Sequence, residues 1–152
     1  MNKQLVYDSI IIGTGPAGLT ASIYASRYRL KNLILGKEKG GTIGLAHNVE
    51  NYPGFRQIAG LDLMDKIEKH AQDLGGKIVY DPVQRVKKNK DNNFLIFTSN
   101  KKEYETKTVI IATGTKRRKL NISGEEEYLG KGVSYCTTCD APFFRDKKVA
   151  LV

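Results

Sequence analysis

The stretch "YDSIIIGTGPAGLTASIYA", residues 7–25, decides the fold. Its short apolar run is rich in β-branched residues and ends at Gly13, as a buried strand does. From Gly15 to about Tyr28 the pattern is helical, and small residues four apart mark one face: Ala17, Ala21 and Ala25. Residues 32–35 form a second apolar run. This order of strand, glycine turn, helix and strand predicts a βαβ unit with a parallel sheet.

The glycine turn itself, "GTGPAG" at residues 13–18, has the spacing GxGxxG. Gly13 permits a tight turn, Gly15 lets a diphosphate approach the backbone, and Gly18 lets the helix pack against the strand. The helix N-terminus offers free N–H groups and a partial positive charge to an anion, and proline suits its first turn. Such a string is weak by itself, but here it sits between the first strand and the first helix. We therefore expect a dinucleotide at Gly13, Thr14, Gly15, Pro16, Ala17 and Gly18.

Further along, a second helix is expected from about Leu61 to Leu74, and its predicted buried stripe is Leu61, Met64, Ile67, Ala71 and Leu74. Strands are expected at residues 77–80, 83–88, 94–99, 104–111 and 147–152, the second and third of these forming a hairpin. The change in composition near residues 114–119 predicts two domains, 1–115 and 116–152. Because about 35 residues are too few for a second core, we expect the chain to be a fragment of a longer protein.

Composition narrows the class of protein. The 152 residues are 40% hydrophobic and 27% charged, which is typical of a soluble globular protein. No apolar run reaches the ~18 residues of a membrane span and no secretory signal is seen, so we expect a cytoplasmic protein without membrane contact. The basic residues behind the net charge of +9 gather in short groups at residues 87–90, 101–102 and 116–119, with acids interspersed elsewhere and without interleaved aromatics. The distribution of charge favours an ordinary solvated surface. Nucleic-acid binding is not expected, and a surface that steers an acidic protein partner is preferred over it.

The two cysteines, Cys136 and Cys139, stand two residues apart in "CTTCD". This spacing allows a disulfide and can lower the pKa of one thiol, and Asp140 beside it could give or take a proton. A closed zinc site needs four ligands, and the only histidines, His47 and His70, are at no zinc-like spacing. A redox pair is favoured, with half of a metal site and two unreactive thiols as the alternatives. Ser134 lacks the His and Asp arrangement of a nucleophilic serine.

Several motifs together resemble the N-terminal half of low-molecular-weight thioredoxin reductases: the glycine turn, Gly40-Gly41, "NVENYPGF" at 48–55, "ATG" at 112–114 and "CTTCDAPFF" at 136–144. The resemblance covers essentially the whole chain, and the VENYPG loop and the CxxCD segment are its most specific parts. It implies an α/β fold, with a Rossmann-like FAD-binding domain, a β-hairpin appendage and the start of a second, NADPH-binding domain. It also implies a cytoplasmic homodimer in which electrons pass from NADPH through FAD and a Cys136–Cys139 disulfide to thioredoxin.

The resemblance also implies roles for residues. Gly13 to Ala17 would hold the FAD diphosphate, and residues 36–42 would lie near its adenosine. The other expected cofactor-binding residues are Gly18, Glu38, Gly40, Gly41, Thr42, Asn51, Val86, Thr113 and Gly114. Cys139 would face the flavin, Cys136 would attack the partner disulfide, and Asp140 would handle the proton. The NADPH site is expected beyond residue 152.

The chain departs from the family pattern at two positions. Leu35 stands where many members place the acid that binds the ribose, and Thr42 stands where a glutamine is common. Glu38 is the nearest acid, either a ribose ligand or a solvated loop residue. Two other functions are kept as alternatives: a truncated dinucleotide-binding module without catalysis, and a flavin-dependent reductase supplied with electrons by ferredoxin.

Overall fold

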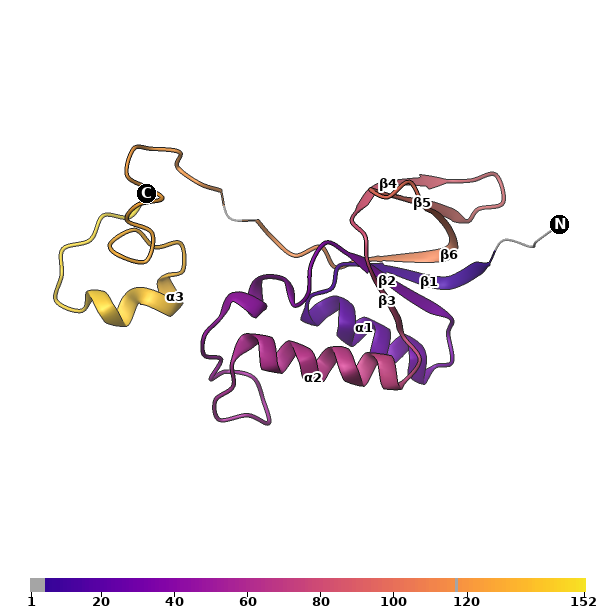
Figure 1. Cartoon of the computed structure of the whole chain (residues 1–152), viewed down its shortest axis with the longest axis horizontal. Coiled ribbons are helices and arrows are strands. Elements are labelled where there is room, and N and C mark those ends of the chain that lie inside the picture. The colour runs from indigo at the N-terminus through magenta and orange to yellow at the C-terminus, as the bar shows by residue number, and fades with distance from the viewer. Residues whose placement is uncertain (1–4, 117) are drawn as a thin grey trace. The chain divides into compact units, whose positions relative to one another are not determined.

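The structure is a computed structural model of the whole chain, and it describes residues 5–116 and 118–152, without the side chains of residues 138 and 139. The described chain divides into two compact units, Met1–Thr115 and Lys116–Val152. Figure 1 shows the first unit as a layered sheet with helices and the second as a small irregular unit.

The first unit is built on one six-stranded sheet in the order β3-β2-β1-β6-β5-β4. Strands β3, β2, β1 and β6 are parallel, while β6, β5 and β4 are antiparallel neighbours. The strands are β1 (Val6–Ile12), β2 (Asn32–Gly36), β3 (Lys77–Tyr80), β4 (Val83–Lys88), β5 (Phe94–Thr98) and β6 (Glu103–Ile111). The predicted βαβ opening and the predicted β4–β5 hairpin are both confirmed, and the fold is α/β as expected.

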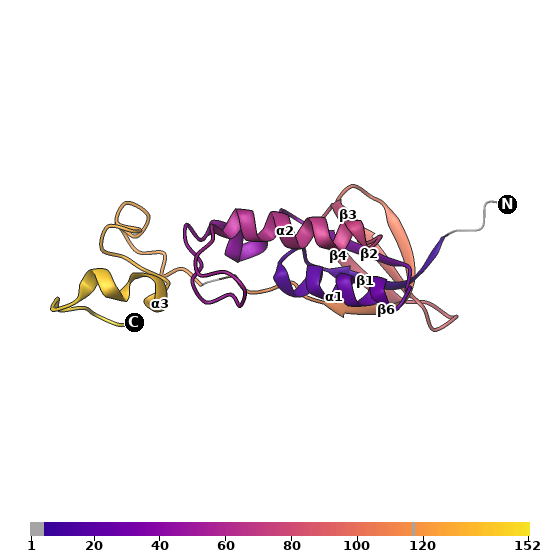
Figure 2. The same ribbon diagram turned by 90° about the horizontal axis from the view of Figure 1, so that it is seen from below.

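Two helices, α1 (Pro16–Arg27) and α2 (Gly60–Asp73), lie side by side on one face of the sheet (Figures 1 and 2). A short 3-10 turn, η1 (Gly41–Leu45), follows β2. The core between the helices and the sheet contains buried residues of β1, β2, α1 and α2: Ile11, Leu19, Ile34, Leu63, Met64, Ile67 and Ala71. Burial of the leucine, isoleucine and methionine side chains contributes about 1.5–3 kcal/mol each and holds α1 and α2 against β1 and β2.

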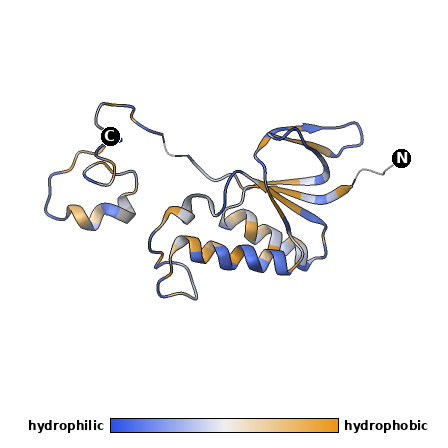
Figure 3. Cartoon of the chain, in the orientation of Figure 1, coloured by the Kyte–Doolittle hydropathy of each residue, from blue (hydrophilic) through white to orange (hydrophobic). Residues whose placement is uncertain are grey.

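A second hydrophobic cluster involves the hairpin. Ile96 of β5 is fully buried with residues of β1 and β2, and the cluster comprises Tyr7, Ile10, Leu33, Leu35 and Ile96. Figure 3 shows hydrophobic residues along the central strands, with hydrophilic and hydrophobic residues mixed along α2. Residues 9–12 of β1 and the whole of β2 are therefore buried on both faces, which explains why their sequences are nearly continuous apolar runs instead of alternating ones.

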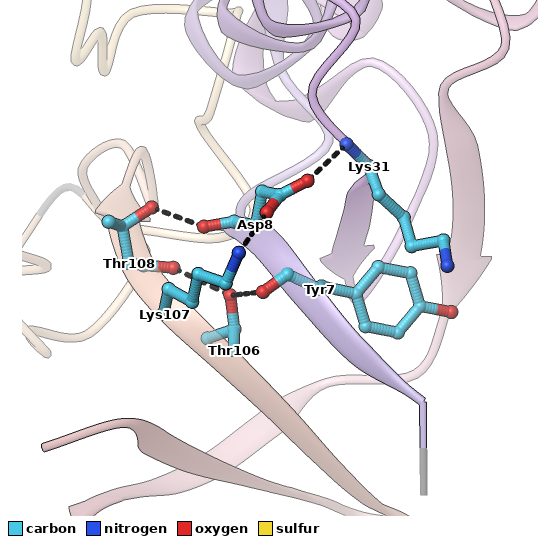
Figure 4. Close-up of polar contacts among 6 residues, drawn as sticks. All are labelled: Tyr7, Asp8, Lys31, Thr106, Lys107 and Thr108. Carbon is cyan, nitrogen blue, oxygen red and sulfur yellow. Dashed lines mark hydrogen bonds and ion pairs between the residues drawn. The ribbon is translucent and has the colours of Figure 1, made fainter. Parts of the chain in front are cut away.

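Polar contacts fix the pairing of β1 with β6, and Figure 4 shows them among Tyr7, Asp8, Lys31, Thr106, Lys107 and Thr108. Thr106 donates its hydroxyl to the Tyr7 carbonyl at 3.2 Å, and Thr108 donates to the Asp8 carbonyl at 2.8 Å. The Lys107 ammonium lies 2.7 Å from the Asp8 carboxylate. This hydrogen bond, with a second from the Lys31 backbone N–H, lowers the pKa of Asp8.

Two of the predictions are wrong, one on the packing of α2 and one on the C-terminal residues. In α2, Leu61 is 54% exposed and Leu74 lies past the helix end, whereas the unpredicted Leu63 is buried. In α1, for which no buried face was predicted, Gly18, Leu19, Ser22 and Ala25 are buried, because Gly18 packs closely against the glycine turn and β1. The expected strand at residues 147–152 is irregular and exposed, since no described strand pairs with it.

The second unit has two short helical turns, α3 (Thr137–Asp140) and η2 (Ala141–Phe144). Residues 120–133 form turns joined by an isolated bridge between Leu129 and Val133. Across the part of the chain that the structure describes, no helix has the length and apolar character that crossing a membrane requires.

Candidate functional site

The glycine turn lies where three parallel strands end. The Gly13 N–H donates to the Leu35 carbonyl at the end of β2, at 2.7 Å. The Ala112 N–H, just after β6, donates to the Ile12 carbonyl at 2.8 Å. The carboxyl ends of β1, β2 and β6 therefore meet at one edge of the sheet, which is the edge where α/β folds of this type bind ligands.

The three glycines of the turn have different surroundings. Gly13 has φ +126°, and a Cβ there would lie 2.0 Å from the Ala112 carbonyl oxygen. A Cβ on Gly18 would lie 1.9 Å from the Gly13 carbonyl oxygen. A Cβ on Gly15 would meet nothing within 4 Å. Packing therefore requires Gly13 and Gly18, whereas Gly15 leaves its backbone open to a ligand.

The N-terminus of α1 is electrostatically suited to an anion. Gly15 is the N-cap, no side chain caps the helix, and the first turn contains no acidic residue. Pro16 begins the helix, and the first-turn N–H groups that follow it have no intrahelical acceptor. The partial positive charge at this end is thus left for a bound group. With the open backbone of Gly15, these features fit the diphosphate of a dinucleotide.

The segment after β2 packs against the glycine turn. The buried Thr14 hydroxyl donates to the Glu38 carbonyl, and a Cβ on Gly36 would lie 2.4 Å from that hydroxyl oxygen. Gly41 has φ +56°, and its Cβ position is 3.4 Å from the Gly15 Cα. The structure therefore brings Glu38 and Gly41 to the glycine turn. The Glu38 contact is made by its backbone, and its side chain is exposed.

The other predicted cofactor residues have different positions. Thr113 and Gly114 follow β6 at the same edge of the sheet, and both are exposed. Asn51 lies on the exposed loop after η1, and Val86 is on β4 with 40% of its surface exposed. No recorded contact among the described residues joins either of these two to the glycine turn. Leu35 is fully buried, so its side chain cannot take the place of a ribose-binding acid.

Thr42 and Gly40 lie at the start of η1. Gly40 has φ +78°, and a Cβ there would lie 3.1 Å from the Met64 side chain, so the loop rests on α2 at this point. Thr42 is exposed. Gly40 and Gly41 both have positive φ, so the loop after β2 can turn sharply here. It thereby contacts the turn at residues 13–18 on one side and α2 on the other.

A polar network that was not predicted links the loop after β2 to α2 and β3. The Lys39 ammonium lies 2.7 Å from the Asp65 carboxylate and 3.7 Å from that of Glu68, both on α2. The Tyr80 hydroxyl donates to Glu68 at 2.6 Å. The bond to Asp65 is the main cause of a raised pKa of Lys39, while burial and then the Glu68 carboxylate raise the pKa of Tyr80. The network ties the loop to α2 and β3.

The redox segment lies in the second unit. Cys136 is disulfide-bonded and forms the N-cap of α3. The side chain of Cys139, the other predicted redox residue, lies outside the described residues. Asp140 ends α3, and its backbone N–H donates to the Cys136 carbonyl at 3.0 Å. Both histidines are exposed, and no group of three or more potential metal ligands gathers within the described residues.

Ser134 contacts both the cysteine backbone and the acid. Its hydroxyl donates to Asp140 Oδ2 at 2.5 Å, and its Oγ accepts the Cys136 N–H at 3.0 Å. The sequence indicated no nucleophilic role for Ser134, and its contact with Asp140, six residues further on, was not predicted. The acceptor half of this arrangement has a local signal, since a serine oxygen often accepts the N–H two residues ahead.

A buried glutamate anchors the residue next to Cys136. Glu125 accepts hydrogen bonds from the Tyr135 hydroxyl and from the backbone N–H groups of Asn121 and Ile122. The Tyr135 oxygen in turn accepts the Leu120 N–H at 3.0 Å. The tyrosine bond is the main cause of a lowered pKa of Glu125, and the same bond raises the pKa of Tyr135. The redox segment is thereby attached to residues 120–125.

Comparison with known proteins places these features in context. Residues 7–152 match the family described as pyridine nucleotide-disulphide oxidoreductase. The chain is 40% identical to the thioredoxin reductase of Bacillus subtilis (strain 168), over 100% of this chain and 48% of that protein. It is therefore similar in sequence along its whole length, and it spans about half the length of the curated relatives it matches.

Solved structures agree with the sequence comparison. The thioredoxin reductase of Streptococcus pyogenes MGAS5005 superposes with a TM-score of 0.81 at 41% identity, over 95% of this chain and 47% of that one. A ferredoxin-flavin thioredoxin reductase from Clostridium acetobutylicum superposes with a TM-score of 0.69 at 36% identity, over 93% of this chain and 48% of that one. The expected Rossmann-like α/β architecture is thus confirmed.

Proposed function

Because the chain belongs to the pyridine nucleotide-disulphide oxidoreductase family, we propose that it is the FAD-binding and disulfide-bearing part of a thioredoxin-disulfide reductase. The observation that carries this proposal is the conjunction, in one chain, of an open glycine turn and a disulfide-bonded CxxCD segment. The relatives named thioredoxin reductase, which match the chain along its whole length, support the same function.

The proposed flavin site is the edge of the sheet around the glycine turn. Residues 13–17 would hold the FAD diphosphate through backbone N–H groups at the start of α1, and Gly15 would allow its close approach. Residues 36–42 and 113–114 would line the same site, and Asn51 and Val86 are proposed as outer contacts. When bound, FAD supplies the two-electron chemistry that links a nicotinamide donor to a disulfide. The NADPH site is proposed to lie beyond residue 152.

The proposed reactive group is the disulfide of Cys136 with Cys139, the only other cysteine. In its reduced form, one thiolate attacks the partner disulfide and forms a mixed disulfide, which the second thiol then resolves. The partner S–S bond breaks, the Cys136–Cys139 bond forms, and the two thiol protons end on the partner's two sulfurs. Cys136 is proposed as the attacking residue, and Asp140 as the group that gives and takes the proton.

The proposed partner is a thioredoxin-like protein, and the proposed setting is a cytoplasmic homodimer. The excess of basic residues, +9 at neutral pH, would favour the approach of an acidic protein surface. The similarity to thioredoxin reductases supports this choice of partner.

A second candidate, a reductase supplied by ferredoxin, is favoured by the likeness to the Clostridium acetobutylicum protein. A donor assay on the full-length gene product, with FAD and thioredoxin, separates the two candidates. We expect thioredoxin reduction with NADPH and none with reduced ferredoxin alone, and the opposite result would establish the second candidate.

In the Cys139→Ser variant FAD should stay bound while thioredoxin reduction is lost. Turnover in that variant would show that the disulfide is not on the route.

A further inference from the structure

We propose that Ser134 is a positioning residue that holds the Asp140 carboxylate in a fixed place beside the redox cysteines. The proposal rests on the function proposed above, because it concerns the acid assigned to proton transfer there. No motif or comparison assigns a role to Ser134; its two hydrogen bonds do.

The geometry assigns each atom of the hydroxyl one use. Ser134 donates its single hydrogen to Asp140 Oδ2 at 2.5 Å, so its lone pairs are left to accept the Cys136 N–H at 3.0 Å. A serine hydroxyl has one donor and two acceptor positions, so both bonds can form together. The donated bond is charge-assisted when the carboxylate is ionised, which is the stronger class of hydrogen bond.

The same contacts fix Asp140 relative to Cys136 from two directions. The Asp140 backbone N–H donates to the Cys136 carbonyl at 3.0 Å, and its side chain is joined through Ser134 to the Cys136 N–H. Among the described residues, Ser134 makes the one recorded side-chain contact with the Asp140 carboxylate. Without it, the side chain of the half-buried Asp140 would lose its link to the Cys136 backbone. Ser134 therefore acts on the chemistry through Asp140.

The arrangement is tested by reduction of the disulfide with dithiothreitol, which needs no flavin. One dithiothreitol thiolate attacks the disulfide, and its second thiol resolves the mixed disulfide. The products are cyclic oxidised dithiothreitol and two cysteine thiols, with both protons supplied by the dithiothreitol thiols. Asp140, as the proposed acid, passes a proton to the leaving cysteine thiolate, so the rate of thiol release reports its position.

The experiment is a double-mutant cycle of Ser134→Ala and Asp140→Asn in the full chain. Thiol release is followed by rapid alkylation and mass spectrometry. Asp140→Asn should slow reduction by about tenfold or more if it acts as a proton-transfer group. Ser134→Ala should slow it by roughly three- to tenfold in the parent and by less than about twofold in the Asp140→Asn background, because its effect passes through that acid.

Two further variants separate positioning from folding. Ser134→Thr keeps the hydroxyl, and it should react within about twofold of the parent. Ser123→Ala removes an exposed hydroxyl elsewhere in the same unit, and it should leave the rate unchanged. Equal slowing by Ser134→Ala with and without the Asp140 carboxylate would overturn the proposal, as would failure of the threonine variant to restore the rate. If Asp140→Asn itself had no effect, the proton role assigned to Asp140 would fall, and the positioning role with it.

Discussion

Replacing Gly15 by alanine should weaken flavin binding while leaving the fold intact, whereas replacing Gly18 should damage the fold. At Gly15 the backbone has φ −83° and an added Cβ meets nothing within 4 Å. Alanine at an N-cap costs about 0.5–1 kcal/mol relative to glycine, and the reduced entropy of the unfolded chain returns about 0.4–1 kcal/mol. The free energy of unfolding should therefore change by less than about 1 kcal/mol.

At Gly18 the added Cβ would lie 1.9 Å from the Gly13 carbonyl oxygen, and backbone lies on both sides of the contact. Relief of such overlap requires the turn and the helix to separate, at a cost of about 3 kcal/mol or more. That is a large share of the roughly 5–15 kcal/mol by which a domain is stable. Gly18→Ala should consequently lower the unfolding midpoint sharply.

For flavin binding, in contrast to stability, the direct effect is expected from the Gly15 variant. The Gly15→Ala methyl group would occupy the space through which the diphosphate approaches the N–H groups of α1. Loss of one hydrogen bond to a charged group, about 1.5–3 kcal/mol, weakens affinity roughly 10- to 100-fold. Denaturant unfolding and equilibrium dialysis with FAD measure the two quantities on the same samples. Parent-like FAD affinity in Gly15→Ala, or absence of FAD binding by the parent chain, would refute the assignment of this turn.

Two other predictions concern hydrogen bonds between a buried glutamate and a tyrosine, Glu68 with Tyr80 and Glu125 with Tyr135. Glu68→Gln weakens the hydrogen bond from Tyr80 and should lower the free energy of unfolding by about 1 kcal/mol. The matched exposed variant Asp73→Asn should lower it by less than about 0.5 kcal/mol. Equal effects of the two variants would contradict a structural role for the buried Glu68. The lowered pKa of Glu125 means that its contribution to stability is present above its usual value of 4.5 and is lost as the pH falls through the folded value. Tyr135→Phe should flatten that loss, measured as the acid dependence of unfolding of residues 116–152, and an unchanged pH profile would disprove the link.

Much of the first unit could be predicted from local sequence. The strands at residues 32–36 and 77–80 are short runs of β-branched and apolar residues bounded by turns, and such signals are local. The glycine turn also follows from local requirements, because Gly13 and Gly18 each meet backbone that only glycine tolerates. These positions could be assigned because their surroundings are set by neighbours in the same βαβ unit.

Other features depend on contacts between distant residues. The sequence around α2 offers Leu61 and Leu63 equally, and packing on the sheet selects Leu63. An amphipathic reading places Glu68 at the surface, yet Tyr80, twelve residues away, makes its burial tolerable. The bond between Ser134 and Asp140 likewise depends on the turn of α3 that brings them together. Tertiary partners of polar residues have no local signal.

The C-terminal residues illustrate a different limit. Residues 147–152 have the apolar, β-branched composition of a strand, but Leu151 and Val152 are 94% exposed. A strand exists only where a neighbour satisfies its backbone groups. Composition therefore indicates which residues favour a strand, but a strand forms only where a neighbouring strand pairs with them.

The central claim, that a flavin at the glycine turn exchanges electrons with the vicinal cysteines, is tested most directly by an anaerobic reductive titration of the FAD-loaded protein. A disulfide is a two-electron couple, so the parent should take up two more electrons per flavin than Cys139→Ser before reduction is complete. Alkylation of samples along the titration should show new thiols on Cys136 and Cys139 in step with that extra uptake. Equal uptake by the parent and the variant, with no thiol released, would contradict the account.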